Sequence, residues 1–472
     1  MKEYNFKEEE FNSLLRNFLK NGEIIDDRYP AKGASIWYPY GFAIMENILK
    51  KAKKLVEKEK FKEIILPSFI NGEEFLKECR AIKDFSERVY WSPVFRKSDY
   101  HVMAPTIEAQ ICSLLSENHK EISFPLYIYS IREIGRYETG KTFPVWKERS
   151  VWPFFELFSV HKKRGELKKT IEQEISFMEN FFKLIGVPVL IVTRPKISKR
   201  LREYSEKRIE AVSITPYNRV VVLANIYDLG DIFSKVYQLT ESNGFYLQMS
   251  TLGFSGRTSI SAISFLANKN GLIIPPSIAP FIGEIILVQN KNEVVNYAQI
   301  VKKELEKSDM RFCWSNQVIG TFGMRKRRAT TKGIPLLIII GEKERKEKIV
   351  RIESRLLPKP KEIPINNLTK EINNLVKKIS YNYGRLATKR LGSLMVNSQN
   401  FKQLKKMLNN DYLVTVPACQ NEKCLMSLEL DTGTEIIGVP LDKKMLVGNK
   451  CIVCDERAYQ NIIMGKKWKG EK

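Results

Sequence analysis

The sequence predicts a multidomain α+β protein, with a mixed, mainly antiparallel sheet in its first domain and two smaller α/β domains after it. Three observations indicate this. The chain has 472 residues, which is more than one hydrophobic core normally serves. Apolar strands alternate with amphipathic helices over about the first 280 residues. Four of the seven cysteines lie close together near the C-terminus.

The first domain is predicted from its hydrophobic periodicity. Residues 126–135 (LYIYSIREIG) and 219–230 (RVVVLANIYDLG) have the length and β-branched content of strands, and residues 63–69 (EIILPSF) resemble them. Residues 168–186 (KKTIEQEISFMENFFKLIG) repeat apolar side chains at helical spacing. Charged residues within the long strands suggest a sheet with one face open to a ligand.

Two proline-rich stretches divide the rest of the chain. Residues 271–280 (GLIIPPSIAP) and 356–364 (LLPKPKEIP) flank a strand, helix, strand, strand pattern that is typical of a small α/β domain. We therefore expect domains at residues 1–275, 276–380 and 381–472.

The net charge is +24 at pH 7. Such a balance favours a polyanionic partner, because Lys and Arg that displace phosphate counterions give affinity without regard to sequence. A run of basic residues at 325–328 lies in the second domain. The alternative is a lysine-rich surface that is only solvated. There is no apolar run of membrane-spanning length and no signal-like N-terminus, so we expect a cytoplasmic protein with no membrane partner.

Two segments carry residues suited to a nucleotide. Arg136 and Glu138 are two apart on a predicted strand and so share a face, and Arg149 and Phe154 flank the start of the next strand. Two strands joined by a charged loop could hold a nucleotide between these residues. The alternative is that the charged residues only form an ion pair between the strands. Arg257 follows a glycine-rich turn at a predicted helix start, where backbone N–H groups suit a phosphate, although most such turns only connect elements.

The C-terminal cysteines have the spacing of a metal site. Cys419 and Cys424 form one short pair, and Cys451 and Cys454 form another. Two such pairs, each near a turn, can point four thiolates at one ion, as a tetrahedral structural zinc site requires. The alternative is four free core cysteines. If zinc is bound, we expect its loss to loosen about the last 80 residues and to leave the first domain largely intact.

An ordered set of motifs resembles prolyl-tRNA synthetases of the archaeal and eukaryotic type. Residues 22–42 (GEIIDDRYPAKGASIWYPYGF) are similar to motif 1, 136–139 to motif 2 and 253–257 (GFSGR) to motif 3. Residues 105–108 (PTIE) are similar to the Thr-x-Glu loop of this family, and 322–344 (FGMRKRRATTKGIPLLIIIGEKE) to its anticodon-binding domain. The resemblance runs nearly end to end. It implies a class II synthetase fold in the first domain, then an anticodon-binding domain and a zinc-binding domain.

The resemblance also implies a reaction and the residues that perform it. ATP and Mg²⁺ would activate an amino acid as its adenylate, and tRNA, by resemblance tRNA(Pro), would take the acyl group. The enzyme is expected to be a homodimer with Zn²⁺ in its last domain. Catalysis would fall to Arg136, Glu138 and Arg257, and ATP binding to the same three with Arg149 and Phe154. The expected amino-acid-binding residues are Thr106, Glu108, Arg136, Glu156, Phe158, Asn225, Tyr227 and Ser255.

The chain departs from the family mainly around the amino acid. Phe158 stands where the family usually has His, and Asn225-Ile226-Tyr227 replaces Thr-Ser-His. Ala104 replaces the Arg before the Pro-Thr loop, and 266–269 (LANK) replaces His-Gly-Asp-Asp. Two further interpretations therefore stand beside a proline–tRNA ligase. One is a paralogue that activates a different amino or imino acid, and the other is a catalytically silent RNA-binding relative.

Overall fold

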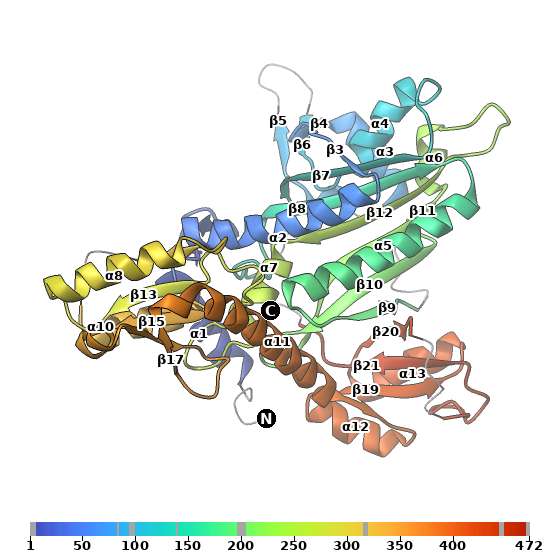
Figure 1. Cartoon of the computed structure of the whole chain (residues 1–472). Coiled ribbons are helices and arrows are strands. Elements are labelled where there is room, and N and C mark those ends of the chain that lie inside the picture. Colours follow the sequence, from blue (N-terminus) through green and yellow to red (C-terminus); the bar gives the residue numbers. More distant parts are fainter. Residues whose placement is uncertain are drawn as a thin grey trace.

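The computed structural model describes residues 6–82, 85–93, 100–137, 140–195, 204–314, 320–442 and 448–468. Figure 1 shows an N-terminal unit (residues 6–282) around a long sheet, a middle unit (residues 283–367) at the left and a C-terminal unit (residues 395–468) at the lower right. Helix α11 (Leu368–Leu394) runs from the middle unit to the C-terminal unit. The predicted order of an α+β unit and two smaller α/β units is confirmed.

An 11-stranded sheet passes through the N-terminal and C-terminal units. Across the N-terminal half, neighbouring strands are antiparallel except at the edge, where the first and second strands of that half pair in parallel. The predicted mixed, mainly antiparallel sheet is confirmed. In sequence order the strands of this half are β3 (Lys62–Glu63), β7 (Leu126–Gly135), β8 (Ser150–His161), β9 (Leu190–Thr193), β10 (Lys207–Ile214), β11 (Val220–Gly230) and β12 (Gln248–Ser255).

Helices and two small sheets cover this half of the sheet. Figure 1 shows α2 and α5 running across one face. The helices are α1 (Glu8–Asn21), α2 (Pro39–Lys58), α3 (Gly72–Ala81), α4 (Glu108–Asn118), α5 (Arg164–Ile185), α6 (Ile232–Tyr237) and α7 (Gly256–Ser264). The small strands are β1 (Ile25–Asp26), β2 (Ile36–Trp37), β4 (Phe69–Asn71), β5 (Trp91–Pro93) and β6 (Tyr100–Met103).

Stacked aromatic rings fix α5 on the sheet. The ring of Phe254 on β12 lies 4.6 Å from that of Phe155 on β8 and 4.7 Å from that of Phe181 on α5. Phe177, one turn earlier on α5, stacks on Phe181 at 5.5 Å. Successive strand residues point to opposite faces, so burying Phe155 and Phe254 under α5 turns their chain neighbours to the other face. That other face carries the candidate site.

The middle unit has the predicted α/β pattern. Its five-stranded sheet has the order β14, β13, β15, β16, β17, with parallel pairing between the first three and antiparallel pairing after them. The strands are β13 (Gly283–Leu287), β14 (Phe312–Cys313), β15 (Leu336–Ile340), β16 (Ile349–Glu353) and β17 (Lys361–Pro364). The helices are α8 (Asn292–Leu305), α9 (Phe322–Lys332) and α10 (Glu342–Glu347).

The C-terminal unit extends the large sheet. Its strand β20 pairs with β9 through Val439 opposite Thr193 and Pro440 opposite Val192. Its elements are β18 (Met395–Asn397), α12 (Phe401–Asn409), β19 (Leu413–Ala418), α13 (Glu422–Thr432), β20 (Ile436–Pro440) and β21 (Gln460–Met464). The predicted boundary after residue 380 falls inside α11, so the division into three ranges stays a prediction.

Strand and helix assignments agree best where the pattern is long. The predicted strands at 126–135 and 219–230 match β7 and β11. The segment at 63–69 is strand only at its two ends, Glu63 of β3 and Phe69 of β4, and Pro67 lies in the irregular stretch between them. None of the described helices is both long and apolar enough to cross a bilayer.

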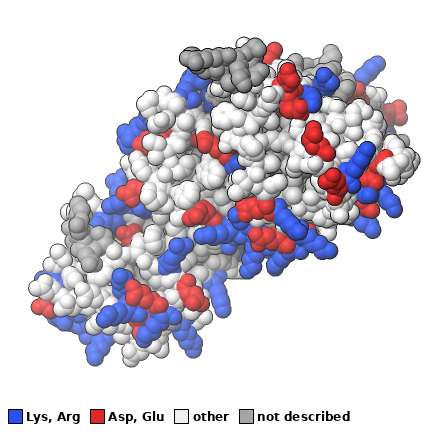
Figure 2. Space-filling view, turned by 90° about the horizontal axis from the view of Figure 1, so that it is seen from above, with Lys and Arg blue, Asp and Glu red and all other residues white. Residues whose placement is uncertain are grey.

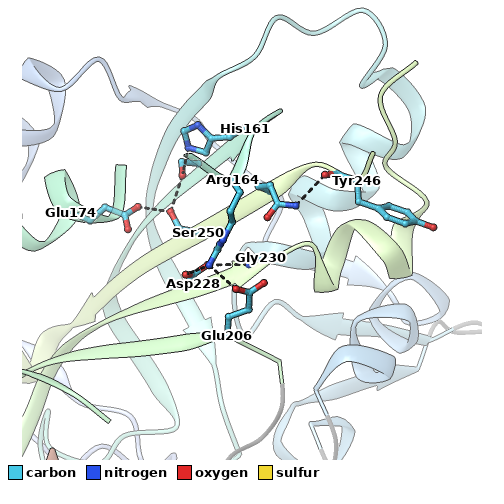
Figure 3. Close-up of polar contacts among 10 residues, drawn as sticks. His161, Arg164, Glu174, Glu206, Asp228, Gly230, Tyr246 and Ser250 are labelled. Atoms are coloured by element: carbon cyan, nitrogen blue, oxygen red, sulfur yellow. Dashed lines mark hydrogen bonds and ion pairs between the residues drawn. The ribbon is translucent and has the colours of Figure 1, made fainter. Parts of the chain in front are cut away.

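A chain of buried polar groups lies between α5 and the sheet (Figure 3). Ser250 donates to a carboxylate oxygen of Glu174 at 2.8 Å and shares a hydrogen bond of 2.8 Å with Ser159, which in turn contacts His161 Nε2 at 3.0 Å. Burial raises the pKa of Glu174 to about 8 and lowers the pKa of His161 to about 4. Both side chains are therefore neutral in the folded protein at pH 7. Nearby, Arg164 at the start of α5 bonds both oxygens of Asp228 at 2.6 Å.

We predict that Glu174→Gln stabilises the protein at pH 8 and not near pH 4.5. The folded state keeps the Glu174 proton up to about pH 8, whereas the unfolded chain releases it near its usual pKa of about 4.3, so the free energy of unfolding falls as pH rises between the two values. A Gln side-chain carbonyl can accept the same hydrogen bond from Ser250. Because Gln does not ionise, the free energy of unfolding does not fall with pH on its account. The expected gain at pH 8 is more than about 1 kcal/mol, seen as a higher Tm.

The matched control is Glu179→Gln, an exposed position on the same helix, which should leave the pH dependence unchanged. An equal Tm difference between Glu174→Gln and the parent protein at both pH values would contradict the prediction.

Candidate active site

A cavity of about 520 Å³ lies on the face of the sheet opposite α5. Its wall combines Arg, carboxylate and aromatic side chains, a composition suited to a charged ligand with a flat ring. A second cavity of about 590 Å³, between the end of α5, α11 and β20, has a mainly apolar wall without Arg. The first cavity contains most of the predicted site residues: Thr106, Glu108, Arg136, Phe154, Glu156, Asn225, Tyr227, Ser255 and Arg257.

The register of β8 and β12 builds the centre of this wall. Phe154 pairs with Ser255 and Glu156 pairs with Gly253. Directly opposite residues of an antiparallel pair share a face, so all four point away from α5. A Cβ at Gly253 would lie 3.4 Å from Cγ of Glu156, which is an ordinary van der Waals contact, so the cavity wall does not strictly require glycine here.

Arg136 bridges two parts of the site. Strand β7 ends at Gly135, but the Arg136 N–H still donates to the Arg149 carbonyl at 2.8 Å and so continues the ladder with the neighbouring segment. The Arg136 guanidinium lies 4.8 Å from the centre of the Phe154 ring and donates to the Pro105 carbonyl at 2.9 and 3.2 Å. It therefore connects an aromatic face with the predicted Thr-x-Glu loop.

Arg257 stands at the first turn of α7, as predicted. Ser255 caps this helix, and its hydroxyl accepts from the Arg257 N–H at 3.4 Å. The Arg257 guanidinium donates to the Trp146 carbonyl at 2.7 and 3.1 Å and lies 5.8 Å from the Trp468 ring centre. A helix N-terminus, a guanidinium and two indole rings thus meet at one end of the cavity, where they favour an anion and a planar base.

Three buried carboxyls gather at the opposite end. Glu108 on α4 and Glu156 on β8 line the cavity, and the Thr106 hydroxyl donates to Glu78 of α3 at 3.0 Å. One oxygen of each of the three carboxyls has no hydrogen-bond partner in the described structure. Burial raises the pKa of all three carboxyls, that of Glu78 to about 8, whereas Arg132 and Arg136 oppose the rise. We call these three residues the acidic floor. Its unpaired acceptors suit a cationic amine.

The side chains of Asn225 and Tyr227, both on β11, are held by an arginine that also forms a buried ion pair. Arg208 on β10 donates to the Asn225 side-chain oxygen at 3.0 Å and lies 5.2 Å from the Tyr227 ring centre. The same guanidinium pairs with the fully buried Glu210 at 2.6 Å. Both predicted residues line the cavity, and Arg208 contacts them from the neighbouring strand on the same face of the sheet.

Two of the predicted residues lie outside the cavity wall, and a third is not among the described residues. Phe158 is fully buried in the apolar cluster formed with α3, α4 and α6 and does not line the cavity, because these helices cover that end of β8. Arg149 packs against Gly33, and its guanidinium lies 4.7 Å from the Tyr137 ring centre. Gly33 has φ +83°, and a Cβ there would lie 2.7 Å from the Arg149 side chain. Glu138 lies outside the described residues.

The sequence reasoning missed several residues of the site. Glu78 occupies the buried stripe of α3 beside Phe75, so a carboxyl at an apolar helix position was the available signal. Arg132 is a buried charge in β7, and Glu148 is a buried carboxyl in the cavity wall. Burial raises the pKa of Glu148 to about 7, and its oxygen accepts from Ser35 at 2.6 Å. Trp146 and Trp468 come together only in the folded chain.

The four C-terminal cysteines converge as predicted. Cys419 follows β19, Cys424 lies in α13, and Cys451 and Cys454 lie in the turn before β21. Their sulfur atoms all lie within 4.8 Å of one another, and those of Cys419 and Cys454 are 3.9 Å apart. Four sulfurs at roughly 2.3 Å from a tetrahedral ion are about 3.8 Å apart. The cluster fits a metal bound by four thiolates.

Two family models match parts of the chain. Residues 284–375 match the model described as anticodon binding domain. Residues 401–468 match the model described as prolyl-tRNA synthetase, C-terminal. The first range corresponds to the middle unit and the beginning of α11, and the second to most of the C-terminal unit.

Curated relatives match over nearly the whole chain. A protein named proline--tRNA ligase from Sulfurisphaera tokodaii is 29% identical over 98% of this chain and 98% of its own. A second protein of that name, from Methanococcoides burtonii, is 27% identical over 98% and 97% of the two chains.

Solved structures share the fold. The prolyl-tRNA synthetase of Giardia lamblia in complex with prolyl-adenylate superposes with a TM-score of 0.90 at 21% identity, over 97% of this chain and 98% of that one. The Cryptosporidium parvum enzyme complexed with L-proline and AMP gives 0.87 at 20% identity, over 97% of each chain.

A mainly antiparallel sheet with Arg136 and Arg257 beside one cavity on its face, followed by an anticodon-binding unit, is the arrangement of a class II aminoacyl-tRNA synthetase. Within that class, the C-terminal family model, the curated relatives and the solved structures all support a member of the prolyl-tRNA synthetase family.

Proposed function

We propose that the protein is a proline–tRNA ligase, which activates proline with ATP as prolyl-adenylate and passes the prolyl group to tRNA(Pro). The observation that carries the proposal is the meeting of two arginines and two carboxyls in one cavity of a chain that aligns with proline–tRNA ligases over 98% of its length. These residues are Arg136, Arg257, Glu108 and Glu156. The names of these curated proteins favour a proline–tRNA ligase over the two alternatives, a paralogue for a different amino or imino acid and a catalytically silent RNA-binding protein.

The activation step needs positioned charge more than proton transfer. A proline carboxylate oxygen forms a bond to the α-phosphorus as the bond from that phosphorus to the bridging oxygen breaks and pyrophosphate leaves. Negative charge is present on both reactants, so Arg136 at the centre of the cavity would hold the carboxylate and α-phosphate together. Phe154 and Arg257 would enclose the adenine, with the N-terminus of α7 beside the phosphates.

Mg²⁺ fits this cavity as the companion of the triphosphate, to which it would contribute charge neutralisation. Glu148 offers a carboxyl on the wall outside the acidic floor and could share the ion. The proline end is suited to a secondary ammonium, whose two N–H groups need two acceptors. Thr106, Glu108 and Glu156 supply oxygen atoms there.

Pyrophosphate exchange across a panel of amino and imino acids tests the substrate. Proline should support exchange with the highest kcat/KM. A higher value with another amino acid would establish the paralogue, and no exchange with any of them would favour the silent relative.

We predict that Arg136→Ala lowers the rate of proline-dependent pyrophosphate exchange by more than about 100-fold, because an effect of roughly 3 kcal/mol is typical of a group that stabilises transition-state charge. Arg385→Ala, at an exposed position of α11, is the matched control and should exchange normally. Exchange by Arg136→Ala within about tenfold of the parent protein would remove Arg136 from its assigned role.

Zinc is the proposed occupant of the four-cysteine site. Four thiolates leave no open position for water or substrate, so its role would be structural. Because β20 pairs with β9 and the Trp468 ring lines the cavity, we now expect metal loss to reach the active site as well as the C-terminal unit. This revises the expectation from the sequence that the first domain would be left intact.

The zinc prediction is one ion per chain, lost in Cys451→Ser and retained in Cys79→Ser, as measured by elemental analysis. Metal loss should expose the C-terminal unit to proteolysis and lower the exchange rate by about tenfold or more, since the binding free energy of a structural metal contributes to folding. Metal-free protein with four reactive thiols in its native state would refute the site.

The tRNA surface is proposed to include the middle unit. Figure 2 shows Lys and Arg side chains gathered over the narrow end of the molecule that holds this unit, with acidic side chains among them. The run at 325–328 is partly engaged within the protein. Lys326 pairs with Glu353 at 2.5 Å and Arg328 with Glu23 at 2.6 Å. Arg327 is exposed, and in the described residues it makes no ion pair.

We predict that tRNA affinity falls by more than about tenfold between roughly 50 and 200 mM salt, because each phosphate contact releases counterions. Arg327→Glu should weaken binding and reduce the salt slope. Lys168→Glu, an exposed position on α5, is the control of equal charge change. A flat salt dependence, measured by filter binding, would show that phosphate contacts do not carry the affinity. A homodimer and a cytoplasmic location stay predictions that accompany this proposal.

A further inference from the structure

Arg132 lies directly behind the acidic floor. On β7 it pairs with Phe154 of β8, so its side chain points to the cavity face of the sheet. The residue is only 9% exposed and is not part of the cavity wall. A buried guanidinium requires partners for its N–H groups, since an unpaired charge at this depth is costly.

Its partners come from three segments, one of which is the loop that presents Thr106 and Glu108. The Arg132 guanidinium donates to the Thr106 carbonyl, to the Gln110 side-chain oxygen at the start of α4, and to the Pro67 carbonyl at 3.3 Å. Gln110 in turn donates to the same Pro67 carbonyl at 2.7 Å. Arg132 therefore joins β7, α4 and the segment before β4 in one network.

The loop is held at two consecutive carbonyls. Arg136 bonds the carbonyl of Pro105 and Arg132 bonds that of Thr106. With the backbone fixed in this way, the Thr106 side chain can donate to Glu78 while its oxygen still offers lone pairs to a ligand. Only a forked, planar group supplies several N–H donors in fixed directions, so lysine cannot replace all of these contacts.

Charge gives the second part of the argument. Glu78, Glu108 and Glu156 face two guanidiniums, those of Arg132 and Arg136. Arg136 is also expected to meet the substrate carboxylate and the α-phosphate, which leaves Arg132 as the cation that serves the floor throughout the reaction. Burial raises the pKa of the three carboxyls, so they ionise together only when cations lie beside them. The two guanidiniums and the ammonium group of the amino acid would supply three cations for the three carboxyls.

We propose that Arg132 is a positioning residue for the amino acid: it fixes the Pro105–Glu108 loop from behind and holds the three carboxyls of the floor together for the ammonium group. This inference rests on the proposed function and deepens it. Arg132 itself touches neither substrate.

The test is pyrophosphate exchange by Arg132→Met and Arg132→Lys, with proline and ATP varied separately. Arg132→Met should raise the KM for proline by more than about 30-fold and change the KM for ATP less than about twofold. Arg132→Lys, which keeps the charge but not the fork, should give an intermediate rise. An unchanged KM for proline, or equal rises for both substrates, would overturn the proposal.

A double variant separates positioning from general damage. In Arg132→Met the three carboxyls share a single guanidinium, that of Arg136. Adding Glu78→Gln removes one of these carboxyls, so the double variant should have a KM for proline at least about threefold lower than that of Arg132→Met alone. Additive or worse losses would overturn the role of the charge. If circular dichroism shows that Arg132→Met does not fold, the test uses Arg132→Lys alone. The same criterion applies: the KM for proline should rise and the KM for ATP should stay nearly unchanged. If the parent protein shows no proline-dependent pyrophosphate exchange, the result counts against the proposed function. If the parent protein exchanges normally and the variants do too, the result counts only against the role of Arg132.

Discussion

The pairing of β8 with β12 is the constraint on which the site depends. One face of this pair is committed to the aromatic stack under α5, where Phe155 and Phe254 lie 4.6 Å apart. The opposite face must then present Phe154 and Glu156 to the cavity. A shift of one residue in either strand would exchange the two faces, placing a carboxyl in the core and a phenyl ring in the site. Packing on one side of the sheet therefore specifies chemistry on the other.

This arrangement buries several ionisable side chains beside the cavity. Burial raises the pKa of all three carboxyls of the acidic floor, and neighbouring carboxyls add to the rise at Glu78 and Glu156. Without nearby cations these carboxyls would take up protons instead of binding a cation. Arg132 and Arg136 oppose that rise and also bond the loop that carries Thr106. The same two guanidiniums thus serve electrostatics and geometry together. A pocket built in this way selects its ligand mainly by the ligand's charge and by the number of hydrogen bonds that the ligand can donate. Apolar contacts contribute less to this selection.

The C-terminal unit is structurally part of the catalytic half of the molecule. Its strand β20 joins β9 in the large sheet, and Trp468 lines the cavity beside Arg257. The Trp468 N–H donates to the Val220 carbonyl at 2.9 Å, which fixes the last described residues along β11. A metal site in this unit would therefore stabilise a wall of the active site as well as its own fold, although the cysteines lie in a separate part of the chain.

The sequence by itself determined the order of units, the long strands β7 and β11, the helix start at Arg257 and the convergence of the four cysteines, because local periodicity and short spacing control these features. It also supplied most of the cavity residues through motif resemblance. Only the tertiary structure decided that Phe158 is covered by helices, that α11 crosses a predicted boundary, and that Glu78, Arg132 and Trp468 meet around one ligand site. These side chains come from α3, β7 and the C-terminus. Their proximity depends on sheet pairing and helix packing between distant segments, which no local pattern of residues records.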